Sequence, residues 1–276
     1  MENKIKKSTS PSSLRKKIIL GLLKDQDFIS TQEILTQCDA SKITIRRDLS
    51  EMEKEGLLIR THGGATKKVS TDYLFNYNDK MNHNREEKDY ICQLAATFIK
   101  PNDIIFIDCG STVSFLPKYI SKINPLTVIT NSLPIASELM NFDNIKSILV
   151  GGEIDNKRKA IYGYSAIQNI SQYHANKAFI GADGISLLKG ITSYHERYAS
   201  ITLRMAENSD EVFLLCDASK IEKNSFVKFA PLSAVNHVIT DPKLDTNLIS
   251  KYKKQNINLL CETTQLTKKT ILSKNQ

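Results

Sequence analysis

The stretch from Ser41 to Ala65, SKITIRRDLSEMEKEGLLIRTHGGA, constrains the fold more than any other part of the chain. On a helix, with its period of about 3.6 residues, three apolar side chains fall within one narrow sector and predict a buried stripe of Ile45, Leu49 and Met52. Arg47 then points almost directly away from this stripe. The segment is therefore expected to pack by one side and to offer basic and polar side chains on the other.

The residues on either side of this helix indicate what kind of unit contains it. Gly56 can adopt the left-handed conformation that ends a helix, and residues 57–64 have the pattern of a strand followed by a tight turn. Upstream, Ser30 and Glu33 have the spacing of a capping box that opens a short helix, and residues 38–41 supply a turn and an N-cap. Helix, turn, basic helix and hairpin together predict a winged helix-turn-helix.

A winged helix-turn-helix places its second helix in the major groove of DNA, where arginine can bind guanine or clamp phosphate. A basic helix face that is merely solvated is the alternative interpretation, and it is the more common one for an isolated basic helix. The flanking helix and hairpin favour DNA binding, with the hairpin reaching the backbone or the minor groove. The residues expected to contact DNA are Ser41, Lys42, Thr44, Arg46, Arg47, Arg60, His62 and Gly63.

The placement of charge supports a nucleic-acid partner. The chain carries 38 Lys and Arg against 30 Asp and Glu, a net charge of +8. Residues 1–70 hold 14 basic and 9 acidic residues, a difference of +5, so the rest of the chain contributes only +3. Basicity concentrated on the small N-terminal part is the electrostatic footprint of a polyanion contact. A generally basic proteome remains an alternative explanation.

The cysteines and the apolar runs indicate the compartment. Five Cys and five His are scattered without the paired spacing of a metal site. Unpaired, dispersed Cys residues argue for a reducing cytoplasm. The sequence contains no apolar run that approaches the roughly 20 residues of a membrane span. We therefore expect a cytoplasmic protein that needs no metal or cofactor and makes no membrane contact.

Apolar runs of about five residues alternate with helical patterns after residue 100. They cover residues 104–107, 126–130, 147–150, 177–181, 212–216 and 237–240. Continuously apolar strands are buried on both faces of a sheet, and helices between them predict parallel crossovers. The predicted fold class is α/β, with the winged helix-turn-helix at the N-terminus. We assign residues 12–68 to the DNA-binding domain, 69–84 to a linker and 85–262 to an α/β effector-binding and oligomerisation domain.

Small and polar residues follow five of these strands, at 108–112, 130–132, 151–153, 181–184 and 217–220. Parallel strands end at the same edge, so these clusters should line one crevice. The loop at 110–112, if it opens a helix, would present backbone N–H groups to a phosphate. Lys220 would neutralise that phosphate, and Asp108 or Asp183 would accept hydrogen bonds from sugar hydroxyls. Taken singly, each cluster is more typical of a turn or a helix cap.

These motifs, in this order, resemble the DeoR family of bacterial regulators of sugar metabolism. The N-terminal match is long and gapless over Ile29 to Thr66, and the resemblance as a whole extends from residue 12 to about residue 245. The C-terminal part is similar to the sensor domain of that family, whose fold is similar to ribose-phosphate isomerases. The resemblance implies a phosphorylated sugar as effector, held by Asp108, Gly110, Ser111, Thr112, Asn131, Ser132, Gly151, Gly152, Asp183, Gly184 and Lys220.

One segment departs from the family pattern. After residues 190–192 the family commonly has an acidic residue and, one turn later, a basic residue, but Tyr198 and Thr202 occupy those places here. An acidic side chain that orients a sugar hydroxyl would then be missing. We therefore expect a different sugar preference, with alternative polar contacts from residues 194–198.

The leading hypothesis is a sequence-specific DNA-binding transcriptional regulator that represses a sugar-utilisation operon under the control of a phosphorylated sugar. It would bind double-stranded operator DNA as a homodimer or homotetramer. The alternative is a sugar-phosphate isomerase or deaminase with an appended DNA-binding domain, although Asp108, Asp183 and Glu196 have no His at a convincing spacing for acid–base chemistry. A redox sensor that uses Cys109 and Cys216 is a third hypothesis.

Overall fold

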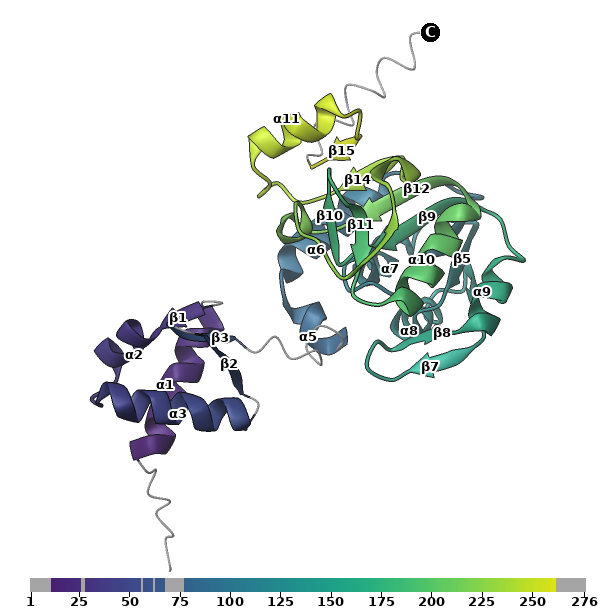
Figure 1. The fold of residues 1–276 in the computed structure, drawn as a ribbon. Coiled ribbons are helices and arrows are strands. Elements are labelled where there is room, and N and C mark those ends of the chain that lie inside the picture. The colour runs from purple at the N-terminus through teal and green to yellow at the C-terminus, as the bar shows by residue number, and fades with distance from the viewer. Residues whose placement is uncertain (1–10, 26–27, 56, 62, 68–76, 262–276) are drawn as a thin grey trace, which may run out of the picture. The chain divides into compact units, whose positions relative to one another are not determined.

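The computed structural model describes residues 11–25, 28–55, 57–61, 63–67 and 77–261. The chain divides into two compact units, Met1–Leu74 and Phe75–Gln276 (Figure 1). Each unit has a hydrophobic core of its own.

The first unit has the elements of a winged helix-turn-helix. They are α1 (Pro11–Asp25), β1 (Phe28–Ser30), α2 (Thr31–Gln37), α3 (Lys42–Lys54), β2 (Leu58–Thr61) and β3 (Gly64–Lys67). The predicted capping box is confirmed, because Ser30 Oγ accepts the Glu33 N–H at 3.1 Å and Glu33 Oε2 accepts the Ser30 N–H at 2.7 Å. The predicted stripe of α3 is confirmed as well: Ile45, Leu49 and Met52 are at most 2% exposed.

The sheet of this unit contains a strand that the sequence did not predict. β1 pairs antiparallel with β3, which in turn pairs with β2, so the order is β1–β3–β2. A strand of three residues is too short to show the alternation by which strands are recognised. Gly56, which was expected to end α3, lies outside the described residues.

A buried ion pair joins α1 to the inner face of α3. Asp48 is 3% exposed, and its Oδ2 lies 2.6 Å from Arg15 Nε. Ser12 Oγ donates to Asp48 Oδ1 at 3.2 Å. Asp48 therefore stabilises the packing of the basic helix, although it lies directly beside the arginines predicted to contact DNA.

The second unit is built on a parallel sheet of seven strands among the described residues, in the order β15–β14–β12–β9–β4–β5–β6. These strands are β4 (Ile104–Ile107), β5 (Leu126–Thr130), β6 (Ile145–Leu149), β9 (Ala175–Gly181), β12 (Ser209–Leu215), β14 (His237–Ile239) and β15 (Leu259–Leu260). In the middle of the sheet, Ile105 of β4 pairs with Val128 of β5 on one side and with Lys177 of β9 on the other. The six predicted apolar runs all occur as strands, and only the two-residue β15 was not predicted.

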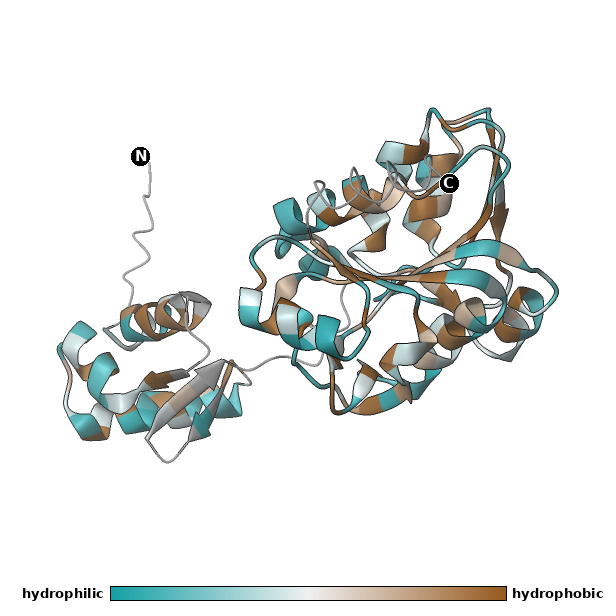
Figure 2. Ribbon diagram, turned by 90° about the horizontal axis from the view of Figure 1, so that it is seen from above, coloured by the Kyte–Doolittle hydropathy of each residue, from teal (hydrophilic) through white to brown (hydrophobic). Residues whose placement is uncertain are grey.

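Helices cover both faces of this sheet. They are α6 (Arg85–Ala96), α7 (Pro117–Ile120) and α8 (Leu133–Leu139) on one face, and α9 (Tyr164–Ile170), α10 (Glu196–Glu207) and α11 (Thr246–Lys254) on the other. Ile105 and Ile107 of β4 pack against the first group, whereas Phe106 packs against the second. Figure 2 shows the strands as hydrophobic ribbons with helices on either side. Burial on both faces confirms the predicted α/β fold.

Short elements follow the carboxyl ends of the strands. They are the hairpin of β7 (Glu153–Asp155) and β8 (Ala160–Tyr162), the antiparallel sheet of β10 (Gly184–Ser186), β11 (Gly190–Ser193) and β13 (Val227–Ala230), and the 3-10 turns η1 (Val113–Phe115), η2 (Ala218–Lys220) and η3 (Leu232–Ala234). The sequence analysis treated these regions as loops. Their strands have no more than four residues each, which is too few for a periodic pattern.

The segment assigned to the linker includes a helix. α5 (Tyr77–Asn82) belongs to the second unit, and its Met81 packs against the core of that unit. The preceding residues, 68–76, lie outside the described residues. Part of the predicted linker is therefore a packed element of the α/β unit.

Gly64→Ala is expected to open the pairing of β1 with β3. A Cβ on Gly64 would lie 2.0 Å from the carbonyl oxygen of Ile29, whereas a Cβ on Gly63 would meet nothing within 4 Å. Overpacking of this kind costs on the order of 1 to 3 kcal/mol. Native-state hydrogen exchange should therefore be faster over residues 28–67 in Gly64→Ala and unchanged in the matched control, Gly63→Ala. Equal protection in the two variants would contradict this account of the sheet.

Candidate functional site

The outer face of α3 is exposed and largely basic. The exposed residues of its first half are Lys42, Ile43, Arg46 and Arg47. Arg47 Nε lies 3.3 Å from Glu51 Oε1, and both side chains are exposed. An exposed ion pair at this spacing contributes little to the free energy of unfolding. A DNA phosphate or base edge would therefore replace Glu51 as the partner of Arg47 at small cost. The arginines therefore point outward, as predicted from the helical period.

Ser41 begins this helix. Its Oγ accepts the Thr44 N–H at 3.3 Å and lies 2.9 Å from Thr44 Oγ1. A serine at the N-cap satisfies an N–H group that the helix leaves unpaired. Ser41 therefore fixes the first turn, where Lys42 and Thr44 lie, in addition to any contact of its own with DNA.

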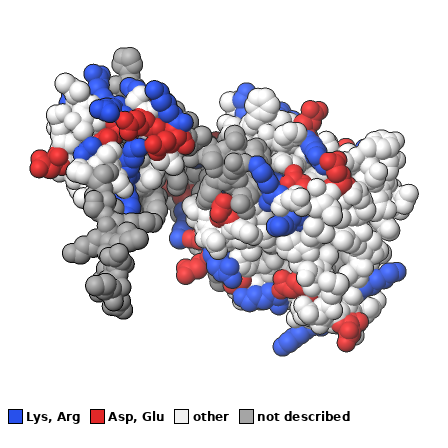
Figure 3. Space-filling view, turned by 90° about the horizontal axis from the view of Figure 1, so that it is seen from below, with Lys and Arg blue, Asp and Glu red and all other residues white. Residues whose placement is uncertain are grey.

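The hairpin between β2 and β3 extends the same unit. Arg60 and Gly63 are exposed, and the Arg60 N–H donates to Glu53 Oε1 at 3.0 Å, which ties the hairpin to α3. His62, also predicted to contact DNA, lies outside the described residues. Figure 3 shows Lys and Arg side chains beside a group of Asp and Glu side chains on this unit, so its surface is mixed in charge rather than uniformly basic.

The candidate effector site lies at the carboxyl edge of the parallel sheet, between β4 and β9. The chain continues from β4 to β5 and β6 on one side, whereas β9 and the later strands lie on the other. Open parallel sheets bind ligands at such a switch point. Gly110 and Gly181 face each other there, since a Cβ on Gly110 would lie 3.6 Å from Gly181 Cα.

Asp108 joins the two sides of this switch point. It is 5% exposed, and its Oδ2 accepts the Thr202 hydroxyl at 3.1 Å and the Gly181 N–H at 3.4 Å. Its Oδ1 accepts the Cys109 N–H at 2.7 Å. The carboxylate predicted to bind a sugar hydroxyl thus holds protein groups from β4, β9 and α10 together.

Asp183 is engaged in a similar way. Its Oδ2 accepts the Ser193 hydroxyl and the Tyr194 N–H, each at 3.1 Å, and its Oδ1 lies 2.7 Å from Lys80 Nζ. Both members of this ion pair are largely buried, with side chains 16% and 8% exposed for Lys80 and Asp183. Lys80 comes from α5, a segment that the sequence analysis assigned to the linker.

The loop at 110–112 does not open the expected helix. It leads into the 3-10 turn η1, and α7 begins only at Pro117 and has four residues. Proline has no N–H to donate, so a helix starting in this loop cannot continue through Pro117 with unbroken hydrogen bonds. The prediction of a helix dipole at this loop is therefore wrong. Gly110 and Ser111 are half-buried and Thr112 is buried.

Asn131 and Ser132 hold the hairpin that follows β6. Asn131 Nδ2 donates to the Ile161 carbonyl at 3.0 Å, and the Asn131 carbonyl accepts the Ile161 N–H at 2.8 Å. Ser132 caps α8 by accepting the Ile135 N–H at 3.4 Å. Both side chains are at most 1% exposed. Asn131 and Ser132 were predicted to bind the effector, and in the structure they position the β7–β8 hairpin.

Two of the predicted glycines have steric reasons for being glycine. A Cβ on Gly152, where φ is +150°, would lie 2.7 Å from the Tyr162 carbonyl oxygen. A Cβ on Gly184 would lie 2.6 Å from the Lys223 carbonyl oxygen. Gly151 is exposed, and a Cβ there would meet nothing within 4 Å. Close backbone packing thus accounts for Gly152 and Gly184 without a ligand.

Cationic side chains from four segments converge on this edge: Lys80 of α5, Lys88 of α6, Arg158 of the β7–β8 turn and Lys220 of η2. Only Lys220 was predicted. Lys88 is 3% exposed and donates to the Lys80 carbonyl oxygen. The Arg158 guanidinium lies 4.3 Å from the centre of the Tyr198 ring, and its Nε is buried without a hydrogen-bond partner among the described residues. An unsatisfied buried donor of this kind suits an anionic ligand.

Burial and neighbouring charges set the pKa values of this cluster. Burial lowers the pKa of Lys80 to about 8 against the attraction of Asp183, and the charges of Arg158 and Lys220 lower it further. Burial likewise lowers the pKa of Lys88 to about 8. Burial alone would raise the pKa of Asp183, but Lys80 and Arg158 outweigh it and bring that pKa to about 2. At neutral pH the ammonium groups are charged but poorly solvated, so they favour an added anion.

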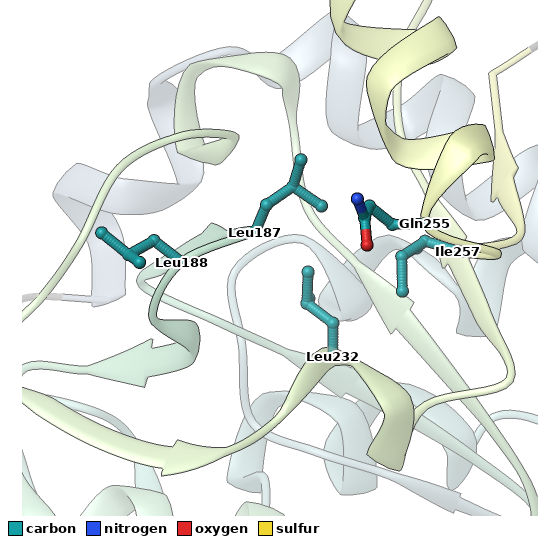
Figure 4. A pocket seen from close by; sticks show the side chains of 5 residues that line it. All are labelled: Leu187, Leu188, Leu232, Gln255 and Ile257. Carbon is teal, nitrogen blue, oxygen red and sulfur yellow. The ribbon is translucent and has the colours of Figure 1, made fainter.

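A separate hollow of about 410 Å³ is apolar. It is lined by Leu187, Leu188, Leu232, Gln255 and Ile257, whose side chains come from the β10–β11 turn, η3 and the end of α11 (Figure 4). This lining offers no charged group to a phosphate. The charged residues at the carboxyl ends of β4 and β9 are therefore the better candidates for binding an ionic effector.

Family models match both units. A DeoR-like helix-turn-helix domain matches residues 15–71, and a DeoR C terminal sensor domain matches residues 83–242. The chain belongs to the DeoR family. It is a DNA-binding transcriptional regulator, which the winged helix-turn-helix and the exposed face of α3 independently support.

Similar DeoR-family proteins include regulators of both signs. The chain is 35% identical to the HTH-type transcriptional repressor GlcR of Bacillus subtilis, over 81% of this chain and 86% of that protein. It is also 35% identical to the L-fucose operon activator of Haemophilus influenzae, over 87% and 96%. A ribose 5-phosphate isomerase A from Methanocaldococcus jannaschii is similar in structure, with a TM-score of 0.37 and 16% identity over 50% of this chain and 55% of that one. So loose a likeness carries no functional conclusion.

The two residues expected to depart from the DeoR-family pattern both donate hydrogen bonds to carboxylates. Tyr198 stands where an acidic residue was expected, and its hydroxyl donates to Asp155 Oδ2 at 3.0 Å. Thr202 stands where a basic residue was expected, and it donates to Asp108. The β7–β8 hairpin brings Asp155 and Arg158 to Tyr198. The hairpin thus brings an acidic and a basic side chain to this region, where Arg197 of α10 also lies over the Tyr162 ring.

Cys109 and Cys216 lack the features of redox-sensing cysteines. Burial raises the pKa of Cys109 to about 12, with a further contribution from Asp108, and burial also raises that of Cys216. Both thiols are buried, and a reactive cysteine needs an accessible thiolate.

The described residues contain no group of three or more potential metal ligands, and none of their helices is long and apolar enough to cross a membrane.

Anion binding in the crevice should weaken as pH rises from 7 to 9. Lys80 and Lys88 lose their charges near pH 8, so affinity should fall by up to about tenfold per pH unit for each ammonium that the anion requires. In the unfolded chain these lysines keep their protons up to about pH 10.4. Between pH 7 and 9 the unfolded chain therefore binds more protons than the native protein, so the free energy of unfolding of the ligand-free protein rises with pH. Calorimetric titration with glucose 6-phosphate at pH 7, 8 and 9 measures the effect, and a flat profile would contradict it.

Proposed function

We propose that this DeoR-family regulator acts in the cytoplasm as a repressor of a sugar-utilisation operon and leaves its operator when a phosphorylated sugar binds. The observation that carries the proposal is the cationic cluster of Lys80, Lys88, Arg158 and Lys220 at the switch point of the sheet. Asp183, Arg158 and Lys220 all lie close enough to Lys80 to shift its pKa, and Lys88 donates to the Lys80 carbonyl oxygen. A phosphate dianion would find charge-assisted donors there.

Two of the three similar proteins compared are named repressors, and the names of two refer to a sugar or to glycerol 3-phosphate. Besides GlcR, the chain is 31% identical to the glycerol-3-phosphate regulon repressor of Escherichia coli, over 81% of this chain and 88% of that protein. The effector is inferred to be held by the cationic cluster, by the loop at 110–112, and by Asp108 and Asp183 after they exchange protein partners for ligand hydroxyls. The β7–β8 hairpin, held by Asn131 and Ser132, supplies Arg158 to the same site.

DNA recognition is proposed to use the exposed face of α3, with the hairpin at Arg60 and Gly63 on the flanking backbone. A single helix-turn-helix reads only a short half-site. We therefore propose a homodimer or homotetramer that presents recognition helices about 34 Å apart, one turn of DNA. The effector would act by favouring an arrangement in which that spacing is lost, because a ligand can shift only an equilibrium between states for which its affinity differs.

His174 and His237, the two histidines that pair with carboxylates among the described residues, do not support the enzyme alternative. His174 lies 2.7 Å from Asp210 and His237 lies 2.6 Å from Glu211, but all four residues are at the amino ends of the strands, opposite the crevice. An isomerase needs its base at the substrate carbon. The similar proteins are also regulators rather than enzymes.

Arg47→Ala should weaken binding to the preferred DNA sequence by about 10- to 100-fold, since a base or phosphate contact from arginine is worth on the order of 1 to 3 kcal/mol. DNA selected from a random library by the full-length chain provides the target for footprinting. Lys54→Ala, at the far end of α3, is the matched control and should bind nearly as the unmodified chain does. Undiminished footprinting by Arg47→Ala would reject the assigned DNA face.

Phosphorylated sugars should raise the melting temperature of the full-length chain, whereas their unphosphorylated counterparts should not. A ligand at 100 times its dissociation constant stabilises the native state by about 2.7 kcal/mol. A thermal-shift screen at pH 7 detects this, with Lys220→Gln expected to weaken the response. A response to free sugars equal to that of sugar phosphates would remove the phosphate from the proposal.

A further inference from the structure

The β7–β8 hairpin is held against the first turns of α10 (Figure 1). The Tyr198 hydroxyl donates to Asp155 Oδ2 at 3.0 Å, and Arg197 Nη2 lies 2.9 Å from Glu153 Oε2. The ring of Tyr162, the last residue of β8, packs on the Tyr198 ring with the two centres 4.9 Å apart. Two neighbouring residues of α10 therefore hold both strands of the hairpin.

Asp155 also shapes the turn of this hairpin. Its Oδ1 accepts the N–H groups of Lys157 and Arg158, each at 3.0 Å. An aspartate that accepts N–H groups two and three residues later in the chain fixes a turn. One carboxylate oxygen thus sets the turn, while the other is held by Tyr198. The position of the turn therefore depends on where the Tyr198 hydroxyl holds Asp155.

The turn carries one of the cations of the proposed effector site. The Arg158 guanidinium lies 4.3 Å from the centre of the Tyr198 ring, and its buried Nε has no hydrogen-bond partner among the described residues. Arg158 is also close enough to Lys80 and Asp183 to shift the pKa of each. Arginine loses much rotamer freedom when it is held in one direction. Contacts that hold it before a ligand arrives therefore strengthen binding.

Tyr198 supplies two such contacts from one side chain. Its ring lies under the Arg158 guanidinium, and guanidinium groups stack favourably on aromatic faces. Its hydroxyl fixes the turn from which Arg158 extends. Burial, together with the charge of Asp155, raises the pKa of Tyr198 to about 12. The hydroxyl therefore keeps its proton, and with it the hydrogen bond to Asp155, throughout the range in which the protein works.

The identity of residue 198 matters for this arrangement. The DeoR-family pattern led us to expect an acidic residue here. A carboxylate at this place could not donate to Asp155 at neutral pH and would put a like charge beside it. A tyrosine at this position is thus compatible with an aspartate at the start of the turn, whereas an acidic residue is not.

We propose that Tyr198 is a positioning residue for effector binding: its hydroxyl holds Asp155, and through Asp155 the β7–β8 turn, so that the Arg158 guanidinium is directed at the phosphate of the effector. The inference rests on the proposed function, because it assumes an anionic effector at the carboxyl edge of the sheet. It deepens that function by naming the residue that sets the direction of one cation. In this role Tyr198 acts through Arg158.

Four variants separate the parts of this arrangement. Tyr198→Phe removes the hydroxyl and keeps the ring under Arg158. Asp155→Ala removes both the turn contacts and the link to Tyr198. Asp155→Asn conserves them, because its oxygen still accepts the turn N–H groups and its amide group donates to the tyrosine oxygen. Tyr252→Phe is the matched control, since the Tyr252 hydroxyl donates to another carboxylate, Glu222 Oε1, at 2.8 Å and does not contact the hairpin.

The measurements are made on full-length protein at pH 7, with glucose 6-phosphate and inorganic phosphate as probes and glucose as the uncharged control. Calorimetric titration gives the dissociation constant of each probe, and thermal unfolding without probe shows that each variant is folded. Each substitution is measured alone and combined with Arg158→Gln. The NMR signal of the Arg158 Nε–H group, assigned by its absence in Arg158→Gln, reports the direction of the guanidinium.

Tyr198→Phe and Asp155→Ala should each weaken probe binding about five- to tenfold, the size expected for a lost hydrogen bond that preorganises a site. Arg158→Gln should weaken it at least about tenfold, because a charge-assisted contact to the phosphate is lost. When Arg158→Gln is present, Tyr198→Phe should cost less than about twofold more, since residues that act through one contact are not additive.

The other variants complete the expected pattern. Asp155→Asn should bind the probe no more weakly than the unmodified chain, and Tyr252→Phe should bind it within about twofold. The Arg158 Nε–H signal should shift on addition of probe in the unmodified chain and in Tyr252→Phe. In Tyr198→Phe the signal should already be displaced without probe, which a loss of stability alone would not cause.

The failures of the two proposals differ. If neither phosphate probe binds the unmodified chain, the anionic effector of the proposed function is wrong. If a probe binds, but Arg158→Gln binds it equally well, or Tyr198→Phe has the same effect with and without Arg158, the proposed function survives and the positioning role of Tyr198 is overturned. If Tyr198→Phe fails to fold, the difference between Asp155→Ala and Asp155→Asn, measured with and without Arg158→Gln, decides between the same outcomes.

Discussion

A largely buried lysine and aspartate, Lys80 and Asp183, form an ion pair that connects separate parts of the C-terminal unit. Such a pair is a weak source of stability, because removing both charges from water costs about as much as their attraction returns. Its effect is on geometry: Asp183 also accepts hydrogen bonds from Ser193 and Tyr194. One carboxylate therefore connects the loop after β9, the small antiparallel sheet and α5. A pair with little net stability can be exchanged for a ligand, whereas a strongly stabilising contact would resist the ligand.

The sequence predicted the elements that rest on periodicity. The stripe of α3, the capping box at Ser30 and the six apolar runs of the sheet follow from local pattern, because burial on one helix face or on both faces of a strand leaves a repeat in the residues themselves. The same local logic predicts a ligand site at the carboxyl edge, because parallel strands must all end there. The exposed arginines of α3 were predictable for the same reason.

The residues that define the crevice were largely unpredictable, because tertiary structure brings them there. Lys80 lies in a short helix near the start of the second unit, and Arg158 lies in the turn of a hairpin whose strands have three residues each. Neither segment has a repeat from which burial could be inferred. Lys88 did leave a signal: it occupies the apolar stripe of α6 with Ile91, Cys92 and Ala95, where a lysine is out of place unless its charge has a use. Pro117 is the residue that argues against the helix predicted after residue 112.

The source of positive charge determines what this site can do. Backbone N–H groups at the start of a long helix bind phosphate well, but they are fixed by the helix and move only with it. Here the turn at residues 113–115 is too short for such a site, and the charge comes from side chains on four different segments. Each of these segments is attached to a different part of the unit, so an anion that draws their cations together changes distances among them. A site built from side chains on separate segments can therefore pass binding on as movement, which suits a sensor domain joined to a DNA-binding unit.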